Sequence, residues 1–318
     1  MLLGPTGVGK TRTAEAVAEI IHGSPKHLLR IDCGEFQMEH EVAKLIGAPP
    51  GYLGHRETQP ALTQMKLNQV MSERANLAIV LFDEIEKAAP SMLRLLLGIL
   101  DRGVLKLGDN TTVQFERTLI FFTSNLGASE IARETGRGFG LRGAAPSDNA
   151  PKDLSRITRA AIERKLSPEF INRVDAFLTY HPLTPDNIRA ILDLQIRAIY
   201  AQLIRRLGNA APELTVTPAA RDFLIARGYS PTYGARELKR TIEKHLVEPL
   251  AGHILDNGKF ATGDRVTASF KRGSSTLTLT VENPIATLTT ALETRPRKIQ
   301  RGARTVELLF TTAAHPTE

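Results

Sequence analysis

The sequence predicts an α/β fold: a parallel sheet with helices on both faces, followed by a smaller, mainly helical domain with short C-terminal strands. In the first part of the chain, short apolar runs alternate with helical patterns, which is typical of βαβ units around a parallel sheet. After His181 and Pro182 the apolar residues recur at helical spacing instead. We therefore expect a large domain over residues 1–181, a small domain over 182–283 and a tail without an assigned role over 284–318.

Three apolar runs of the large domain are candidate strands, namely residues 28–31, 78–82 and 119–123. A stripe of leucines at helical spacing follows Pro90 and Ser91, which suit the first helical position or an N-cap. Residues 104–107 and 111–115 predict a hairpin around a Gly-Asp-Asn turn. The run 136–151 is rich in Gly, Ala, Pro and Ser and predicts a mobile loop.

The small domain opens with an apolar helical face. Its members are Ile188, Ile191, Leu192, Ile199 and Leu203. Two further helices are expected over residues 218–226 and 235–255, and alternating apolar residues predict strands over 265–270 and 276–281. This order predicts a helical domain that ends in two strands.

Composition limits the class of protein. With 318 residues and 42% apolar content, the chain can bury two cores without metals or disulfides. Cys33 is the single cysteine and lies in an apolar stretch, which predicts a buried structural thiol. No apolar run approaches the length of a membrane span, and Met1 leads straight into a motif without the regions of a signal peptide. We therefore expect a cytoplasmic protein without membrane contact.

The chain is basic, with a formal net charge of +7. Most basic residues are scattered among acidic ones on helix faces, which is typical of solvated surface. A denser basic cluster lies in the tail and indicates contact with an anion. Its members are Arg295, Arg297, Lys298, Arg301 and Arg304.

A phosphate-binding loop is the first motif that carries chemistry. The pattern G-x-x-x-x-G-K-[ST] stands between an apolar pair and a helical pattern, and its residues are Gly4, Pro5, Thr6, Gly7, Val8, Gly9, Lys10 and Thr11. Glycines let backbone N–H groups converge on phosphate oxygens, and the helix N-terminus adds positive partial charge. Lys10 is expected to hold the β- and γ-phosphates and Thr11 to ligate Mg²⁺. A glycine-rich turn with a chance lysine does not account for the strand-turn-helix context.

Two carboxylates end the buried run 78–82. Charged groups at the end of a buried strand are costly unless they meet a cation or water. Asp83 is expected to orient Mg²⁺ through its water shell. Glu84 is then placed to polarise the attacking water as a base. The alternative is a solvated turn, which the phosphate loop argues against.

Seven motifs together resemble one family. LGPTGVGKT, RIDCGEF, GAPPGYLG, VLFDEIEKA, TSNLGA, PEFINRVD and GARELKR stand in the order typical of the C-terminal AAA+ module of Clp and disaggregase ATPases, over residues 2–282. The resemblance implies a P-loop NTPase (AAA+) fold, ATP and Mg²⁺ as cofactors, and ATP hydrolysis coupled to protein unfolding. It also implies a homo-oligomer, a hexameric ring that takes protein substrates. Family members carry adenine contacts and most of the first strand ahead of this loop, a segment expected to be missing here.

The resemblance assigns three more site residues. Asn125 resembles the sensor-1 residue that positions water or reads the γ-phosphate. Arg173 resembles the arginine finger that completes a neighbouring subunit's site, the alternative being a salt bridge to Asp175 or Glu169. Arg236 resembles the sensor-2 arginine of the small domain, the alternative being an ordinary arginine on a helix surface.

Two further segments are assigned to partners. Tyr52, within Gly51, Leu53 and Gly54, resembles the pore-loop aromatic that grips an extended polypeptide; the alternative is an aromatic packed in a turn. Phe139, Gly140 and Leu141 match the hydrophobic-Gly-hydrophobic tripeptide with which some Clp ATPases dock on a ring-shaped peptidase. Alternatively, this tripeptide folds back on the module's own surface.

Two other functions remain as alternatives. An AAA+ nucleic-acid remodeller or loader shares the phosphate machinery, and the basic tail supplies phosphate contacts, but the GYLG pore motif argues against it. A nucleotide-dependent scaffold with low turnover would not need the set Glu84, Asn125, Arg173 and Arg236.

Overall fold

The computed structural model describes residues 1–47, 60–127, 150–230, 234–258, 260–283, 299–301 and 304–306. The chain forms two compact units, one of Met1–Thr184 with Ser230–Arg236, the other of Pro185–Tyr229 with Glu237–Glu318. None of the described helices combines the length and the hydropathy needed to cross a bilayer.

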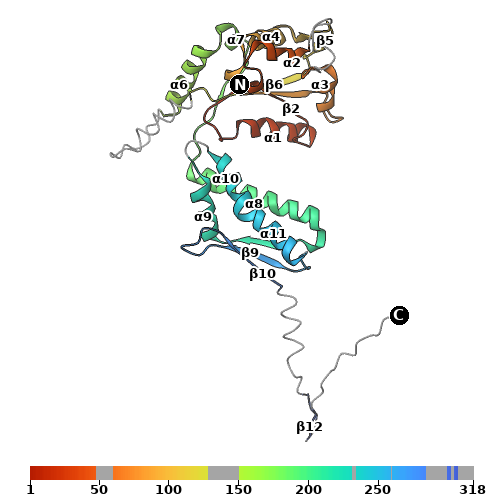
Figure 1. Cartoon of the computed structure of the whole chain (residues 1–318), viewed down its shortest axis with the longest axis vertical. Helices are drawn as coiled ribbons and strands as arrows, with labels where there is room; N and C mark the ends of the chain where they lie inside the picture. The colour runs from red at the N-terminus through yellow and green to blue at the C-terminus, as the bar shows by residue number, and fades with distance from the viewer. Residues whose placement is uncertain are drawn as a thin grey trace, which may run out of the picture. The chain divides into compact units, whose positions relative to one another are not determined.

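The first unit (Figure 1) contains a central parallel sheet. Its five strands have the order β2-β3-β6-β1-β7. Every pairing in this sheet is parallel, so the carboxyl ends of its strands lie at one edge. The elements of the unit are β1 (Leu2–Leu3), α1 (Lys10–His22), β2 (Leu29–Asp32), η1 (Cys33–Glu35), η2 (Glu39–Val42), α2 (Ala43–Ile46), α3 (Gln64–Val70), β3 (Ala78–Asp83), η3 (Ile85–Lys87), α4 (Pro90–Arg102), β4 (Val104–Lys106), β5 (Thr112–Gln114), β6 (Thr118–Ser124), α6 (Ala150–Lys165), α7 (Pro168–Asn172) and β7 (Leu178–Thr179).

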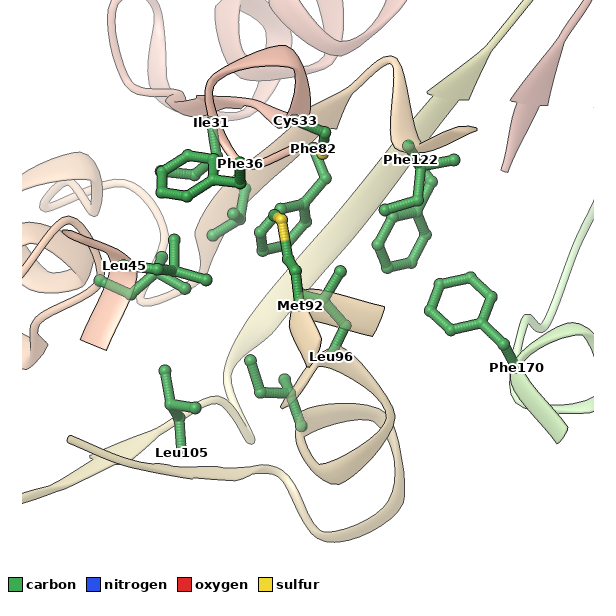
Figure 2. Packing of buried hydrophobic residues seen from close by; sticks show 14 of the residues in the cluster. Ile31, Cys33, Phe36, Leu45, Phe82, Met92, Leu96, Leu105, Phe122 and Phe170 are labelled. Carbon is green, nitrogen blue, oxygen red and sulfur yellow. The ribbon is translucent and has the colours of Figure 1, made fainter. Parts of the chain in front are cut away.

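The central strand β3 is buried along its whole length. Its alternate residues Val80 and Phe82 belong to the main apolar core, because successive side chains of a strand point to opposite faces. Phe82 stacks on Phe122 of β6 with 5.5 Å between ring centroids, and Phe122 meets Phe170 of α7 edge-on at 5.3 Å (Figure 2). Fully burying such a ring contributes about 1.5–3 kcal/mol. On α1, which packs against β3, Ala14 is fully buried.

Most expected elements of the first unit occur within a residue or two of their predicted bounds. The helix α4 begins at Pro90 in the first turn, and Ala89, not Ser91, is its N-cap. The hairpin forms as the antiparallel pair β4 and β5. The expected loop 136–151 is wrong at its end, because α6 already begins at Ala150, and its residues up to 149 lie outside the described part of the chain. Cys33 is a buried free thiol, and burial raises its pKa.

The second unit combines helices with a three-stranded sheet of order β10-β9-β8. Its elements are α8 (Pro185–Leu207), η4 (Gly208–Ala210), β8 (Glu213–Val216), α9 (Pro218–Gly228), α10 (from Ala235 to Ile242), a π-helical turn η5 (Glu243–Val247), α11 (Glu248–Asn257), β9 (Arg265–Ser269) and β10 (Thr278–Glu282). The buried face of α8 contains Ile188 and Leu192, as predicted, and also Ile196. In the tail, the short strands β11 (Ile299–Arg301) and β12 (Arg304–Val306) pair antiparallel.

Two predictions for the second unit need correction. The sequence pattern predicted one helix over residues 235–255, but the π-helical turn Glu243–Val247 interrupts it ahead of Pro249. It also predicted two strands, whereas Glu213–Val216 adds a third that pairs parallel with β9. A four-residue strand carries too few alternating positions to stand out in a sequence.

Candidate nucleotide site

The phosphate loop connects β1 to α1. Gly9 is the N-cap of α1, with φ 106° and ψ 13°. This left-handed backbone favours glycine. The first turn of α1 contains no acidic residue, and no side chain caps it. The N–H groups of the first turn therefore lack the partners that side-chain caps supply elsewhere, and they form a site suited to an anion.

Lys10 directs its side chain back over this loop. Its Nζ donates to the carbonyl oxygens of Gly4 and Pro5, both at 2.7 Å, and to Oδ1 of Asn125 at 2.8 Å. Burial lowers the pKa of Lys10 to about 8, against the opposing charge of Glu86 and other nearby carboxylates. A buried ammonium whose hydrogen bonds go mainly to neutral acceptors is suited to bind an anion, which is a stronger acceptor.

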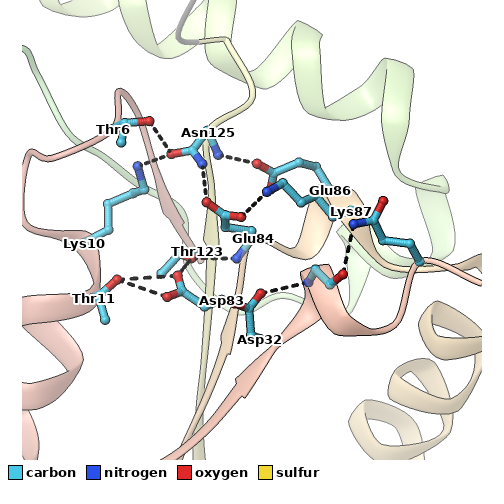
Figure 3. A network of polar contacts seen from close by, with 12 residues as sticks. Thr6, Lys10, Thr11, Asp32, Asp83, Glu84, Glu86, Lys87, Thr123 and Asn125 are labelled. Carbon is cyan, nitrogen blue, oxygen red and sulfur yellow. Dashed lines mark hydrogen bonds and ion pairs between the residues drawn. The ribbon is translucent and has the colours of Figure 1, made fainter. Parts of the chain in front are cut away.

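Three side chains contact the carboxylate of Asp83 at the end of β3. Thr11 Oγ1 lies 3.4 Å from each of its carboxylate oxygens (Figure 3). Arg30 Nη2 lies 2.5 Å from Oδ2. The hydroxyl of Thr123 donates to Oδ1. These partners come from α1, β2 and β6, because the parallel strands end at the same edge of the sheet.

Glu84 follows with a left-handed backbone, at φ 58° and ψ 50°. Its N–H donates to Thr123 Oγ1 at 3.0 Å, which ties the turn to β6. Asn125 Nδ2 donates a hydrogen bond to Glu84 Oε1 at 3.3 Å, and Lys87 forms an ion pair with Oε2. A non-glycine residue in this region is held against strain of about 1–3 kcal/mol, which is typical of functional sites.

These groups line one cavity of about 400 Å³. Its walls are Thr6, Gly7, Gly9, Lys10, Thr11, Arg12, Arg30, Asp32, Asp83, Glu84, Lys87, Thr123, Asn125 and Arg236. Arg236 belongs to the segment Ser230–Arg236 of the first unit, and the N–H of Ala235 donates to the carbonyl of Gly7 at 3.1 Å. A Cβ on Gly234 would lie 2.8 Å from the carbonyl oxygen of Thr6, so this approach requires glycine.

Arg173 does not line this cavity. Its Nε lies 2.5 Å from Asp101 Oδ1. The ion pair therefore joins Arg173 to Asp101 and not to Asp175 or Glu169, the two acids that the alternative to the finger role named. Gly4, Pro5 and Val8 belong to the loop without lining the cavity.

The predicted pore residues, from Gly51 to Gly54, lie outside the described residues, as does the predicted docking tripeptide, from Phe139 to Leu141.

The residue-by-residue prediction missed several polar groups of the site: Arg12, Arg30, Asp32, Glu86, Lys87 and Thr123. Most of them lie inside the quoted motifs RIDCGEF, VLFDEIEKA and TSNLGA, so a signal was present. Spacing alone does not say which of them pair with Asp83 or Glu84, because the pairs mostly join different strands.

The residues present fit ATP and Mg²⁺. Phosphate oxygens are stronger acceptors than the carbonyl oxygens that Lys10 now contacts. The hydroxyl of Thr11 beside the carboxylate of Asp83 is the combination of groups that holds Mg²⁺ next to a phosphate loop.

The phosphate loop after β1, the acidic pair at the end of β3 and the parallel strand order define a P-loop NTPase of the AAA+ class. The chain belongs to the family described as AAA domain (Cdc48 subfamily), which matches residues 1–177. Residues 183–268 match the C-terminal, D2-small domain of ClpB protein. Membership implies nucleotide binding.

Curated relatives are chaperones and protease subunits. The chain is 39% identical over 280 residues to the chaperone protein ClpB of Aquifex aeolicus (strain VF5), which covers 86% of this chain and 26% of that protein. It is 37% identical over 276 residues to the ATP-dependent Clp protease ATP-binding subunit ClpC of Staphylococcus aureus (strain USA300), which covers 85% and 32%. The chain thus spans about a quarter to a third of these relatives.

Solved structures agree on the fold. A closed-state cryoEM reconstruction of Hsp104 with ATPγS and FITC casein superimposes with a TM-score of 0.68 at 28% identity, over 87% of this chain and 44% of that one. The S. cerevisiae Hsp104:casein complex in its extended conformation gives a TM-score of 0.69 at 27% identity, with the same coverage.

Proposed function

We propose that this chain is the ATP-hydrolysing motor module of a Clp-type protein unfoldase that works in the cytoplasm. One observation carries the proposal: Lys10, Asp83 and Glu84 line a single cavity above the N-terminus of α1. A cation for phosphate, a carboxylate for metal and a second carboxylate for water are the minimum set for phosphoryl transfer to water.

Each group takes one role in hydrolysis. Lys10 and the loop N–H groups hold the phosphates, while Thr11 and Asp83 hold Mg²⁺, which supplies charge neutralisation at the phosphates when bound. Glu84 accepts a proton from the attacking water. Asn125, which already contacts both Lys10 and Glu84, orients that water relative to the phosphate.

The motor acts as a ring, proposed here to be a hexamer. Arg173 serves the site of a neighbouring subunit, and Arg236 reads the nucleotide in its own. Tyr52 grips an extended protein substrate in the central pore, and the described relatives of known structure are complexes of Hsp104 with casein. A Clp-type peptidase is a further partner, docked through Phe139 and Leu141, and one relative is named as a Clp protease subunit.

The test couples ATPase activity to unfolding of a tagged fluorescent protein. The chain should hydrolyse ATP, and fluorescence should fall only with ATP present. Tyr52→Ala should keep ATPase within about twofold and lose unfolding, because an aromatic grip makes no phosphate contact. Tyr200→Ala, an exposed tyrosine of α8, is the matched control and should retain both activities.

Other outcomes separate the alternatives. ATPase stimulated by DNA without unfolding would support a nucleic-acid remodeller. Tight ATP binding without turnover would support a nucleotide-dependent scaffold.

A further inference from the structure

Lys87 lies directly on the carboxylate proposed as the base. Its Nζ forms an ion pair with Oε2 of Glu84 (Figure 3). The local backbone explains the contact: the N–H of Lys87 donates to the carbonyl of Glu84 at 2.9 Å and closes a 3₁₀ turn over Ile85–Lys87. Side chains three residues apart are eclipsed in a 3₁₀ turn, so the sequence E-x-x-K brings the ammonium over the carboxylate.

The other oxygen of Glu84 is held as well. Asn125 Nδ2 donates to Oε1 at 3.3 Å, and the backbone N–H of Asn125 is itself fixed by Glu86 Oε1 at 3.0 Å. One donor on each oxygen defines the plane of the carboxylate, whereas one donor alone leaves rotation about the last side-chain bond. Lys87 is the charged and closer of the two donors.

The surroundings keep Lys87 charged and in reach. Its pKa is raised, first by the hydrogen bond and charge of Glu84 and then by Asp32 and Glu86. The lysine stem runs beside Gly34, because a Cβ on that glycine would lie in ordinary contact with Lys87 Cδ, at 3.7 Å.

We propose that Lys87 is a positioning residue for Glu84, which acts by aiming the carboxylate at the attacking water. The proposal rests on the proposed function, since it assigns Glu84 as the base. Exposed ion pairs contribute little to stability. The Lys87 side chain is 46% exposed, so its measurable effect should lie in turnover rather than in folding.

The experiment compares steady-state ATPase of three variants of the full chain. Lys87→Met should lower kcat about tenfold or more with the KM for ATP within about twofold, because a small misplacement of a reacting group costs rate and not binding. Lys87→Arg retains a cation and should recover most of the loss. Lys44→Met is the matched control: Lys44 faces Glu41 at the same three-residue spacing, away from the site, and kcat should not change.

A second measurement does not depend on activity. The titration of Lys87, followed by the NMR shift of its Cε, should move to lower pH in Glu84→Gln. An unchanged titration would overturn the pairing.

If the parent enzyme is active and the kcat of Lys87→Met is unaltered or increased, the positioning role is overturned and the proposed function still stands. A parent chain without ATPase would overturn the proposed function itself, and with it this role for Lys87. A kcat loss that Lys87→Arg does not recover, accompanied by a lower Tm, would reduce Lys87 to a structural residue.

Discussion

Asp101, near the end of α4, forms an ion pair with Arg173, the C-cap of α7, with 2.5 Å between Oδ1 and Nε. The Arg173 side chain remains 55% exposed in this pair. It does not line the cavity that contains Glu84. The proposed role of Arg173 at a neighbouring subunit requires an arginine that is exposed and does not belong to its own subunit's cavity.

The first prediction concerns this arginine. Arg173→Ala should be inactive alone, but mixtures with Glu84→Gln should recover part of the ATPase, because some interfaces then join an intact arginine to an intact base. The measurement is ATPase across mixing ratios at constant total protein. Arg189→Ala, which breaks the exposed pair with Asp186, is the control and should act like the parent. Rings that form but stay inactive at every ratio would contradict a role in trans.

The second prediction concerns Glu84 itself. Glu84→Gln should bind ATP with nearly the parent affinity and lose turnover by at least about a hundredfold, because Lys10 and Thr11 still hold the nucleotide while the proton acceptor is gone. Equilibrium binding of a fluorescent ATP analogue and single-turnover hydrolysis measure the two effects separately. Turnover within a few-fold of the parent would reject Glu84 as the base.

The third prediction is a pH dependence from Lys10. Its pKa is about 8 in the folded chain against an ordinary value of 10.5. Below pH 8 Lys10 is charged in both states, and the cost of burying that charge lowers the free energy of unfolding by its full amount. Between pH 8 and 10.5 the folded chain releases a proton that the unfolded chain keeps. The free energy of unfolding therefore rises with pH over this range.

Lys10→Met lacks this group. Without nucleotide, its Tm should exceed that of the parent at pH 7, and the difference should shrink toward pH 10. A constant difference in thermal scans over that range would show that Lys10 does not titrate there.

The fourth prediction uses two helical glycines of the second unit. A Cβ on Gly228 of α9 would lie 2.7 Å from Leu238 Cα, whereas one on Gly252 of α11 would meet nothing within 4 Å. Gly228→Ala should therefore destabilise by about 1–3 kcal/mol through overpacking. Gly252→Ala should stabilise by about 0.5–1 kcal/mol, because alanine favours the helix. Urea denaturation of both variants checks the signs, and equal effects would contradict the packing argument.

The sequence by itself determined the parts of this protein that depend on neighbours along the chain. The phosphate loop needs its glycines and Lys10 within one strand-turn-helix, and the carboxylates of Asp83 and Glu84 need only to follow a buried strand. Asn125 was assigned through the family resemblance, and it lies at the same edge because parallel strands end together. The order of helices and strands followed from hydrophobic periodicity, except where an element was short, as in β8, or was interrupted, as at the π-helical turn.

The tertiary structure decided which of these groups meet. Arg30 reaches Asp83 only because β2 pairs with β3, and Thr123 reaches it only because β6 pairs with the other side of β3. Arg173 forms its ion pair with Asp101 and not with the acidic residues that lie closer to it in the sequence, in its own motif. Periodicity reports which face of an element is buried, but it does not report strand order or register. Contacts between residues far apart in the chain therefore follow only from how the sheet is assembled.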